Sequence, residues 1–138
     1  MDERLKVLVV DDDVDFVKIT KAMLERNGYV VATAFSGQEG RKKAKSEQPD
    51  LIVLDAMMET ETEGFHVAYD IRKDAELRST PIVMLTAINL RDFPWKVQQH
   101  ETWLPVDVFL DKPVTSEKLV AEVNKVLRDR KSTRLNSS

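Results

Sequence analysis

The sequence contains no cysteine, and this absence removes several classes of protein. Disulfide bonds, thiolate nucleophiles and cysteine-ligated zinc sites are excluded, and a reducing compartment is compatible with the composition. Long apolar runs are also absent, since no stretch approaches the roughly 20 residues of a membrane span. The first apolar run is too short for a signal peptide. We therefore expect a cytoplasmic protein with no membrane partner.

The chain also lacks an excess of positive charge, with 21 Lys and Arg, 24 Asp and Glu, and a net charge of −3. This balance gives no reason to expect direct nucleic-acid binding. The 138 residues are 42% hydrophobic, which suits one globular domain. We place this domain at residues 1–130. Residues 131–138 are polar and lack periodicity, which predicts a disordered tail, a linker stub or a non-native extension.

Short apolar runs alternate with helical patterns along the chain, which predicts an α/β fold with a parallel sheet. Each run is continuous and rich in β-branched residues, as in strands buried on both faces. The expected strands are 5–10, 29–34, 51–54, 82–85 and 108–110. Helices are expected from about Asp15, after the Ser36 cap, at 65–73 and from about Ser116. The segment 88–105 has the poorest pattern, with a helix expected around Val97.

Polar residues stand at the ends of four of these apolar runs. Asp11 and Asp12 follow the first, Asp55 ends the third, Thr86 the fourth, and Lys112 comes just after the fifth. Because the carboxyl ends of parallel strands meet at one edge of an open sheet, we expect these residues to converge. Three carboxylates, a hydroxyl and an amine suit a divalent cation and a phosphoryl group.

The acidic residues predict a specific chemistry. Asp11 and Asp12 repel each other unless a cation compensates, and with Asp55 they can share a Mg²⁺ ion. The Asp55 carboxylate can then attack phosphorus and form an acyl phosphate. Lys112 precedes Pro113, and we expect its amine to pair with Asp55 and the Lys-Pro bond to be a candidate cis peptide.

The acidic residues also allow other interpretations. Asp13 or Asp15 can simply cap the following helix. A calcium loop is rejected because Phe16 and Ala22 stand where that loop needs Gly and Glu. An aspartate-nucleophile phosphatase is an alternative, since Asp11 and Asp13 form a D-x-D pattern, but Asp15 stands where that motif has Thr or Val.

Two binding functions are also alternatives on the same fold. An interaction module without phosphorylation would not need the complete set of acidic, hydroxyl and lysine residues. A flavin-binding protein is disfavoured because no Ser/Thr/Gly-rich phosphate loop follows the first strand.

The motifs VVDDD, LIVLDAMM, MLTA and FLDKPV, in this order and spacing, resemble the receiver domain of two-component response regulators. The resemblance covers about residues 4–128. It implies a flavodoxin-like, doubly wound sheet of five parallel strands in the order 2-1-3-4-5, with helices on both faces. It also implies a phosphoacceptor signalling domain instead of a conventional enzyme. Its partners would be a sensor histidine kinase or phosphotransfer protein, and a downstream target or a missing output domain; a homodimer stays open.

The resemblance implies roles for the acidic residues and their neighbour. Asp55 corresponds to the phosphoacceptor. Asp12, Asp55 and the Met57 carbonyl correspond to direct Mg²⁺ ligands, and Asp11 acts mostly through water. The Met57 side chain offers no polar group to position a water molecule, which favours slow self-dephosphorylation.

The resemblance also implies a phosphoryl-binding pair, Thr86 and Lys112, and a switch formed by Thr86 and Phe109. Two departures stand out. The loop after residue 58 begins with Glu59 where the family usually has proline, and the acidic run 59–64 is one residue longer than is usual in the family. The segment between Thr86 and Lys112 is also longer than usual, so the family's output geometry cannot be copied onto this chain.

Overall fold

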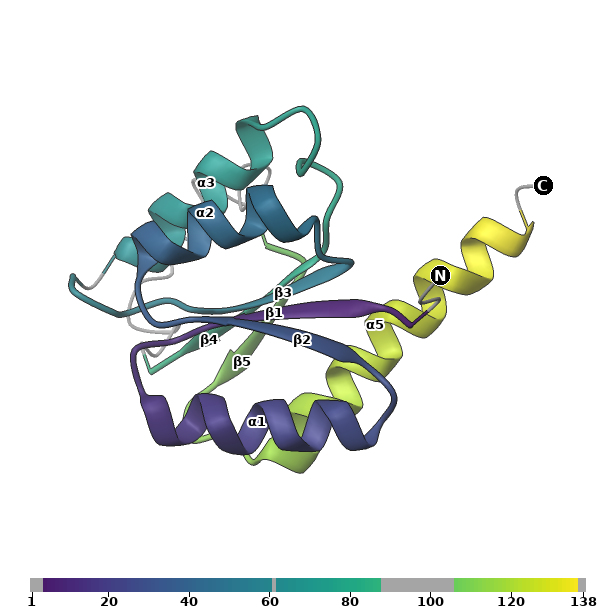
Figure 1. Cartoon of the computed structure of the whole chain (residues 1–138), viewed down its shortest axis with the longest axis horizontal. Coiled ribbons are helices and arrows are strands. Elements are labelled where there is room, and N and C mark those ends of the chain that lie inside the picture. The colour runs from purple at the N-terminus through teal and green to yellow at the C-terminus, as the bar shows by residue number, and fades with distance from the viewer. Residues whose placement is uncertain (1–3, 61, 88–105, 137–138) are drawn as a thin grey trace.

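The computed structural model describes residues 4–60, 62–87 and 106–136, and these form a five-stranded parallel sheet covered by helices (Figure 1). The strands are β1 (Lys6–Val10), β2 (Val30–Ala34), β3 (Leu51–Asp55), β4 (Ile82–Thr86) and β5 (Val108–Asp111). Their order is β2-β1-β3-β4-β5, and every neighbouring pair is parallel. The predicted α/β fold and strand order are confirmed.

Helices lie on both faces of the sheet. Figure 1 shows α1 (Val14–Arg26) and α5 (Ser116–Asn136) below the sheet, and α2 (Gly37–Glu47) and α3 (Glu63–Lys73) above it. None of the helices in the described part of the chain is long and apolar enough to cross a membrane. The helix predicted around Val97 lies outside the described residues.

The sheet separates two apolar layers, because successive strand residues point to opposite faces. On the α1/α5 side the buried strand residues are Val7, Val9, Leu51, Val53, Val83, Leu85 and Leu110. On the α2/α3 side they are Leu8, Val10, Ala34, Ile52, Leu54, Ile82 and Met84. β3 and β4 are buried along their whole length, which is why their sequences read as continuous apolar runs.

Three helix boundaries differ from the sequence prediction. α1 begins at Val14 because Asp13 caps it, its carboxylate accepting the Phe16 N–H at 3.1 Å. α3 begins at Glu63, two residues earlier than predicted, where tertiary contacts hold the chain. α5 runs to Asn136, so the backbone is helical over much of the segment 131–138 that was predicted to be disordered. No Gly or Pro interrupts α5, so the local sequence does not stop the helix at residue 131.

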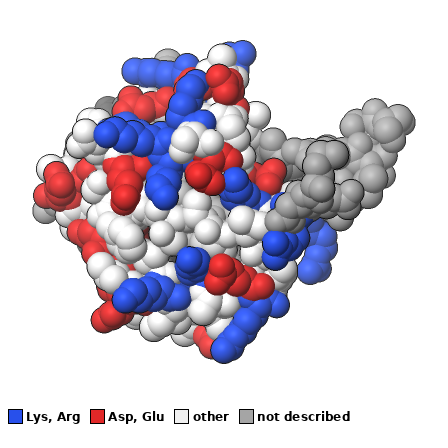
Figure 2. Space-filling model, in the orientation of Figure 1, with Lys and Arg blue, Asp and Glu red and all other residues white. Residues whose placement is uncertain are grey.

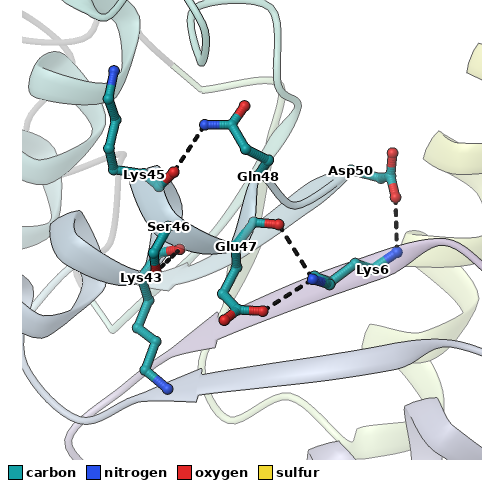
Figure 3. Close-up of polar contacts among 7 residues, drawn as sticks. All are labelled: Lys6, Lys43, Lys45, Ser46, Glu47, Gln48 and Asp50. Carbon is teal, nitrogen blue, oxygen red and sulfur yellow. Dashed lines mark hydrogen bonds and ion pairs between the residues drawn. The ribbon is translucent and has the colours of Figure 1, made fainter.

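At the amino-terminal edge of the sheet, charged groups pair with each other and with helix ends. Figure 3 shows the Lys6 amine lying against the C-terminal end of α2, where it bonds the Glu47 carbonyl at 3.3 Å and the Glu47 carboxylate at 2.9 Å. The Lys6 N–H donates to the Asp50 carboxylate at 2.8 Å. A cation at a helix C-terminus is stabilising, so Lys6 ties the start of β1 to the end of α2.

Basic residues of α2 pair with acidic residues on and just after α3. Arg41 pairs with Asp70 at 2.6 Å, and Lys45 pairs with Asp74 at 2.9 Å and Glu76 at 3.2 Å. Figure 2 shows acidic and basic side chains interspersed on this side of the molecule, without a large patch of one sign. Exposed pairs of this kind contribute little to stability.

We expect Thr20→Val to stabilise the protein by about 1 kcal/mol. Thr20 is fully buried on α1, and within the described residues its hydroxyl has no hydrogen-bond partner. Valine keeps the shape and removes the unsatisfied polar group. Thr115→Val is the matched control, because the Thr115 hydroxyl accepts the Lys118 N–H at 3.1 Å and its loss should destabilise by about 1 kcal/mol. Urea unfolding of both variants measures this; a less stable Thr20→Val would contradict it.

Candidate functional site

Three carboxylates gather at the carboxyl-terminal edge of the sheet, as predicted. Asp11 and Asp12 follow β1, and Asp55 is the last residue of the neighbouring β3. Each offers an oxygen, and these oxygens lie within 4.8 Å of one another. Asp11 and Asp55 are buried, whereas Asp12 is exposed. Two of the three carboxylates are therefore buried at the edge of the core, and the cluster is open to solvent on the side of the third.

The acidic loop after β1 divides its carboxylates between two tasks. The Asp11 N–H donates to the Ala34 carbonyl at 3.1 Å, which fixes the backbone where β1 ends. The Asp11 carboxylate accepts the Asp13 N–H at 2.9 Å, and Asp13 in turn caps α1. Asp13 is thus occupied as a cap, which argues against the phosphatase alternative that needs it in the site.

Lys112 reaches both buried carboxylates. Its amine lies 3.2 Å from Asp55 Oδ1 and 3.4 Å from Asp11 Oδ2, so the expected pairing with Asp55 is confirmed. The Lys112 N–H donates to the Thr86 carbonyl at 2.8 Å, which continues the β4–β5 ladder by one residue. The Lys112–Pro113 bond is cis, as predicted.

The ring of Phe16 borders Lys112, a contact that was not predicted from the sequence. The Lys112 amine lies 5.9 Å from the centroid of the Phe16 ring. A ring face attracts a cation at this distance. Phe16 follows the acidic loop on α1, so the same helix that Asp13 caps also borders the amine. Spacing in the sequence alone gave no signal for this contact.

The environment shifts the pKa values of two members of the cluster. Burial raises the pKa of the Asp11 carboxyl, the Asp13 N–H lowers it, and the nearby Asp55 carboxylate raises it further. Burial alone lowers the pKa of the Lys112 amine, but Asp11 and Asp55 outweigh this effect and hold its pKa above the ordinary value. Lys112 is therefore a permanent cation between two carboxylates at neutral pH.

Thr86 lies at a strand end, as predicted, and Phe109 lies inside β5. Thr86 ends β4 and is buried, and in the register of the sheet it stands opposite Asp111. Phe109 is half-buried on β5 and packs on the α2/α3 side. Its ring centroid lies 6.3 Å from that of Phe65 on α3, with an angle of 37° between the rings. Their roles in a switch stay predictions.

The loop that leaves Asp55 returns tightly against it at the start of α3. The Met57 N–H donates to the Asp55 carboxylate at 3.2 Å, and the Gly64 N–H donates to the Ala56 carbonyl at 2.9 Å. A Cβ on Gly64 would lie only 2.2 Å from the Asp55 carbonyl oxygen. Glycine is therefore required here by close approach of the backbone. In the sequence alone, Gly64 stands out only as the last residue of the acidic run 59–64.

The residues present fit a hard divalent cation. Mg²⁺ prefers oxygen ligands, keeps several waters, and needs only one or two protein carboxylates. The cluster offers one exposed and two buried carboxylates, and one face of it is open for water. The predicted ligands Asp11, Asp12 and Asp55 are brought together, and the role of the Met57 carbonyl stays a prediction.

The site and fold agree with comparisons to known proteins. A family model described as the response regulator receiver domain matches residues 7–124. The alkaline phosphatase synthesis transcriptional regulatory protein PhoP of Bacillus subtilis (strain 168) is 41% identical over 123 residues, covering 89% of this chain and 48% of the relative. The probable transcriptional regulator ycf27 of Guillardia theta is 36% identical over 128 residues, covering 93% and 47%. The chain spans about half the length of the curated relatives it matches.

Solved structures give the same result. The chemotaxis protein CheY4 of Vibrio cholerae matches with a TM-score of 0.76 at 32% identity, covering 89% of this chain and 98% of that one. The receiver domain of the Francisella response regulator 1452 matches with a TM-score of 0.77 at 28% identity, covering 92% and 99%. The resemblance drawn from the strand-end motifs is thereby confirmed.

We expect Asp11→Asn to raise the free energy of unfolding at about pH 7 when divalent cations are absent. A carboxyl whose pKa is raised by folding loses stability as the pH rises from its unfolded pKa, near 4, through its folded pKa. Asparagine carries no charge, and Lys112 keeps its contact with Asp55. The gain should disappear below about pH 4, where Asp11 is protonated in both states.

Urea unfolding in the presence of a chelator, repeated across this pH range, measures the effect. Asp13→Asn is the matched control, because it removes an exposed carboxylate two residues away and asparagine still caps the helix. A variant Asp11→Asn that is less stable than the wild type at about pH 7 would contradict the sign argued from burial.

Proposed function

The chain belongs to the response regulator receiver domain family, and from this premise we propose that it accepts a phosphoryl group on Asp55. The donor is a sensor histidine kinase or a phosphotransfer protein. The observation that carries the proposal is the contact of the Lys112 amine with both Asp55 and Asp11 inside a cluster of three carboxylates. An amine and an acidic cluster at one strand edge suit the binding of a phosphoryl group and a cation.

Phosphoryl transfer forms one bond and breaks one bond. A carboxylate oxygen of Asp55 attacks phosphorus, and the bond from phosphorus to the histidine nitrogen of the donor breaks. Asp55 is buried and accepts the Met57 N–H, so its carboxylate is oriented before the donor arrives. The Lys112 amine neutralises charge on the phosphoryl oxygens as they pass to Asp55.

Mg²⁺ is the cofactor that the cluster fits. Asp11, Asp12, Asp55 and the Met57 carbonyl would hold it, with Asp11 acting through water. When bound, the ion supplies positive charge that offsets the repulsion among carboxylates and incoming phosphoryl oxygens.

The phosphorylated state would be read out through Thr86 and Phe109. A phosphoryl group adds about −1.5 to −2 charges at pH 7. The Thr86 hydroxyl then moves toward the phosphoryl oxygens, and Phe109 turns into the space it leaves. The half-buried position of Phe109 beside Phe65 supports this step, because a ring at the edge of the core has room to change its packing.

The output is a protein contact. The matched relatives include transcriptional regulators about twice the length of this chain, so an output domain or a separate downstream protein is the partner we propose. The domain does not bind nucleic acid directly in this proposal, in keeping with its net charge of −3. We propose residues 1–130 as the receiver domain and a cytoplasmic location.

We expect the wild-type protein to gain one phosphoryl mass when incubated with acetyl phosphate and Mg²⁺, and Asp55→Asn to gain none. Intact-mass spectrometry measures this. Asp70→Asn is the control, because Asp70 is an exposed carboxylate that pairs with Arg41 on the outer face of the helices. Phosphorylation of Asp55→Asn to the wild-type level, or none in the wild type, would refute Asp55 as the phosphoacceptor.

We expect the phosphoryl group to persist for minutes or longer, and Met57→Asn to shorten its lifetime by about tenfold or more. An amide beside the phosphoryl group can position an attacking water molecule, whereas a thioether cannot. Met58→Asn is the control, because both methionines are half-buried in the same loop. Decay of the phosphorylated mass after removal of the donor measures the lifetime. A wild-type lifetime of only seconds would contradict the expectation.

A further inference from the structure

The carboxylate of Glu63 joins two elements beside the candidate site. Glu63 is the first residue of α3, and its Oε2 accepts the Glu59 N–H at 2.8 Å. Its Oε1 accepts the Gly37 N–H at 3.2 Å. Glu59 belongs to the loop that leaves Asp55, and Gly37 is the first residue of α2. One half-buried side chain therefore holds this loop against the start of a different helix.

The start of α2 offers a backbone N–H donor to the Glu63 carboxylate. The first N–H groups of a helix have no partner within it. The N-cap Ser36 hydroxyl accepts the Glu39 N–H at 3.1 Å, and the Glu39 carboxylate accepts the Phe35 N–H, just before the helix, at 2.6 Å. The Gly37 N–H donates to the Glu63 carboxylate instead. A carboxylate is also favoured at a helix N-terminus by the helix dipole.

Two glycines make the approach possible. A Cβ on Gly37 would lie 2.3 Å from Glu63 Oε1, so any larger residue would push the carboxylate away. Gly64, the residue after Glu63, packs on the backbone of Asp55 and Ala56. The start of α3 thus rests on the phosphoacceptor strand while its first side chain reaches α2. Movement of the start of α2 or of α3 would therefore displace the loop between Asp55 and Glu63.

We propose that Glu63 is a positioning residue for the phosphorylation site, which rests on the function proposed above. Glu63 acts through the Glu59 N–H on the loop that carries Met57, and so keeps the Met57 carbonyl and the Asp55 carboxylate arranged for a divalent cation. The same carboxylate links the start of α2 to the state of that loop. Through Glu59 and Glu63, the chain after Asp55 is thus connected to the start of α2.

The first test is the affinity for Mg²⁺ of Glu63→Gln, measured by calorimetric titration without a phosphoryl donor and well below the unfolding temperature. Glutamine keeps the size but has one acceptor oxygen, so one of the two N–H donors would face an amide NH₂ group. We expect the Kd to rise about tenfold, at the low end of the effect of removing an outer-shell partner. The control Glu76→Gln, which loses only an exposed contact with Lys45, should leave the Kd unchanged.

The second test is a double-mutant cycle between Gly37 and Glu63. Gly37→Ala should weaken Mg²⁺ binding in the wild type, because its methyl group displaces the Glu63 carboxylate. In a Glu63→Ala background the same change should have no effect on Mg²⁺ binding, since the space is then empty and alanine is a good helix former. The coupling between the two changes isolates their contact.

A spectroscopic reading separates positioning from a purely structural role. In wild-type protein, addition of Mg²⁺ should shift the backbone amide signal of Gly37 in a ¹H–¹⁵N spectrum, and in Glu63→Gln this response should be lost. If Glu63 served only to stabilise α2, the Kd for Mg²⁺ would be equal in all variants and the Gly37 response would be unchanged.

The outcomes of the two proposals are distinguishable. A wild type that gains a phosphoryl group, with Glu63→Gln and Gly37→Ala matching its Kd and its rate of phosphorylation, would overturn the role of Glu63 and leave the function of Asp55 intact. A wild type that gains no phosphoryl group would overturn the proposed function, and the comparison of Kd values would still decide whether Glu63 positions the cation-binding loop.

Discussion

The site depends on one lysine that is shared by two buried carboxylates. Asp11 and Asp55 would repel each other strongly in the apolar end of the sheet, and the Lys112 amine lies within 3.4 Å of both. With Asp12, the ionised cluster carries two more negative charges than the single amine can balance. This residual charge equals that of one divalent cation, in keeping with the magnesium site proposed above.

The architecture brings these groups together with little help from the loops. β1 and β3 are neighbours, so Asp11 and Asp55 leave the sheet side by side, and β5 brings Lys112 in from the far side of β4. The two apolar layers fix the strands that carry them. Glycine at position 64 then lets α3 begin directly against the backbone of Asp55. The geometry of the site is largely a property of strand order and register.

This is why much of the fold and of the candidate site could be predicted from the sequence. Continuous apolar runs such as LIVL identify strands buried on both faces, and the strand-end rule then places Asp55 and Asp11 at one edge of the sheet. The resemblance to receiver domains supplies the strand order that makes them neighbours. The pairing of Lys112 with Asp55 follows from opposite charges at one edge. The helix caps at Asp13 and Ser36 follow from local chemistry.

What could not be predicted depends on the path of the chain between elements. The bond from Gly37 to Glu63 joins residues 26 positions apart, and its existence depends on how the chain after Asp55 returns to the sheet. The contact between Phe16 and Lys112 depends likewise on the packing of α1 beside the end of β5. Periodicity also underestimated α5, because it reports which residues face a core and not where a helix ends.

The hydrogen bond from the Lys112 N–H to the Thr86 carbonyl has a consequence for how receivers of this kind vary. Residues 86 and 112 are neighbours across a ladder, so their separation is set by the spacing between adjacent strands and not by the stretch of chain that connects them. That stretch can be lengthened, shortened or rewritten for new partners while the hydroxyl and the amine stay in register. The segment that can differ between partners is therefore separate, within one short sequence, from the two residues whose positions stay the same.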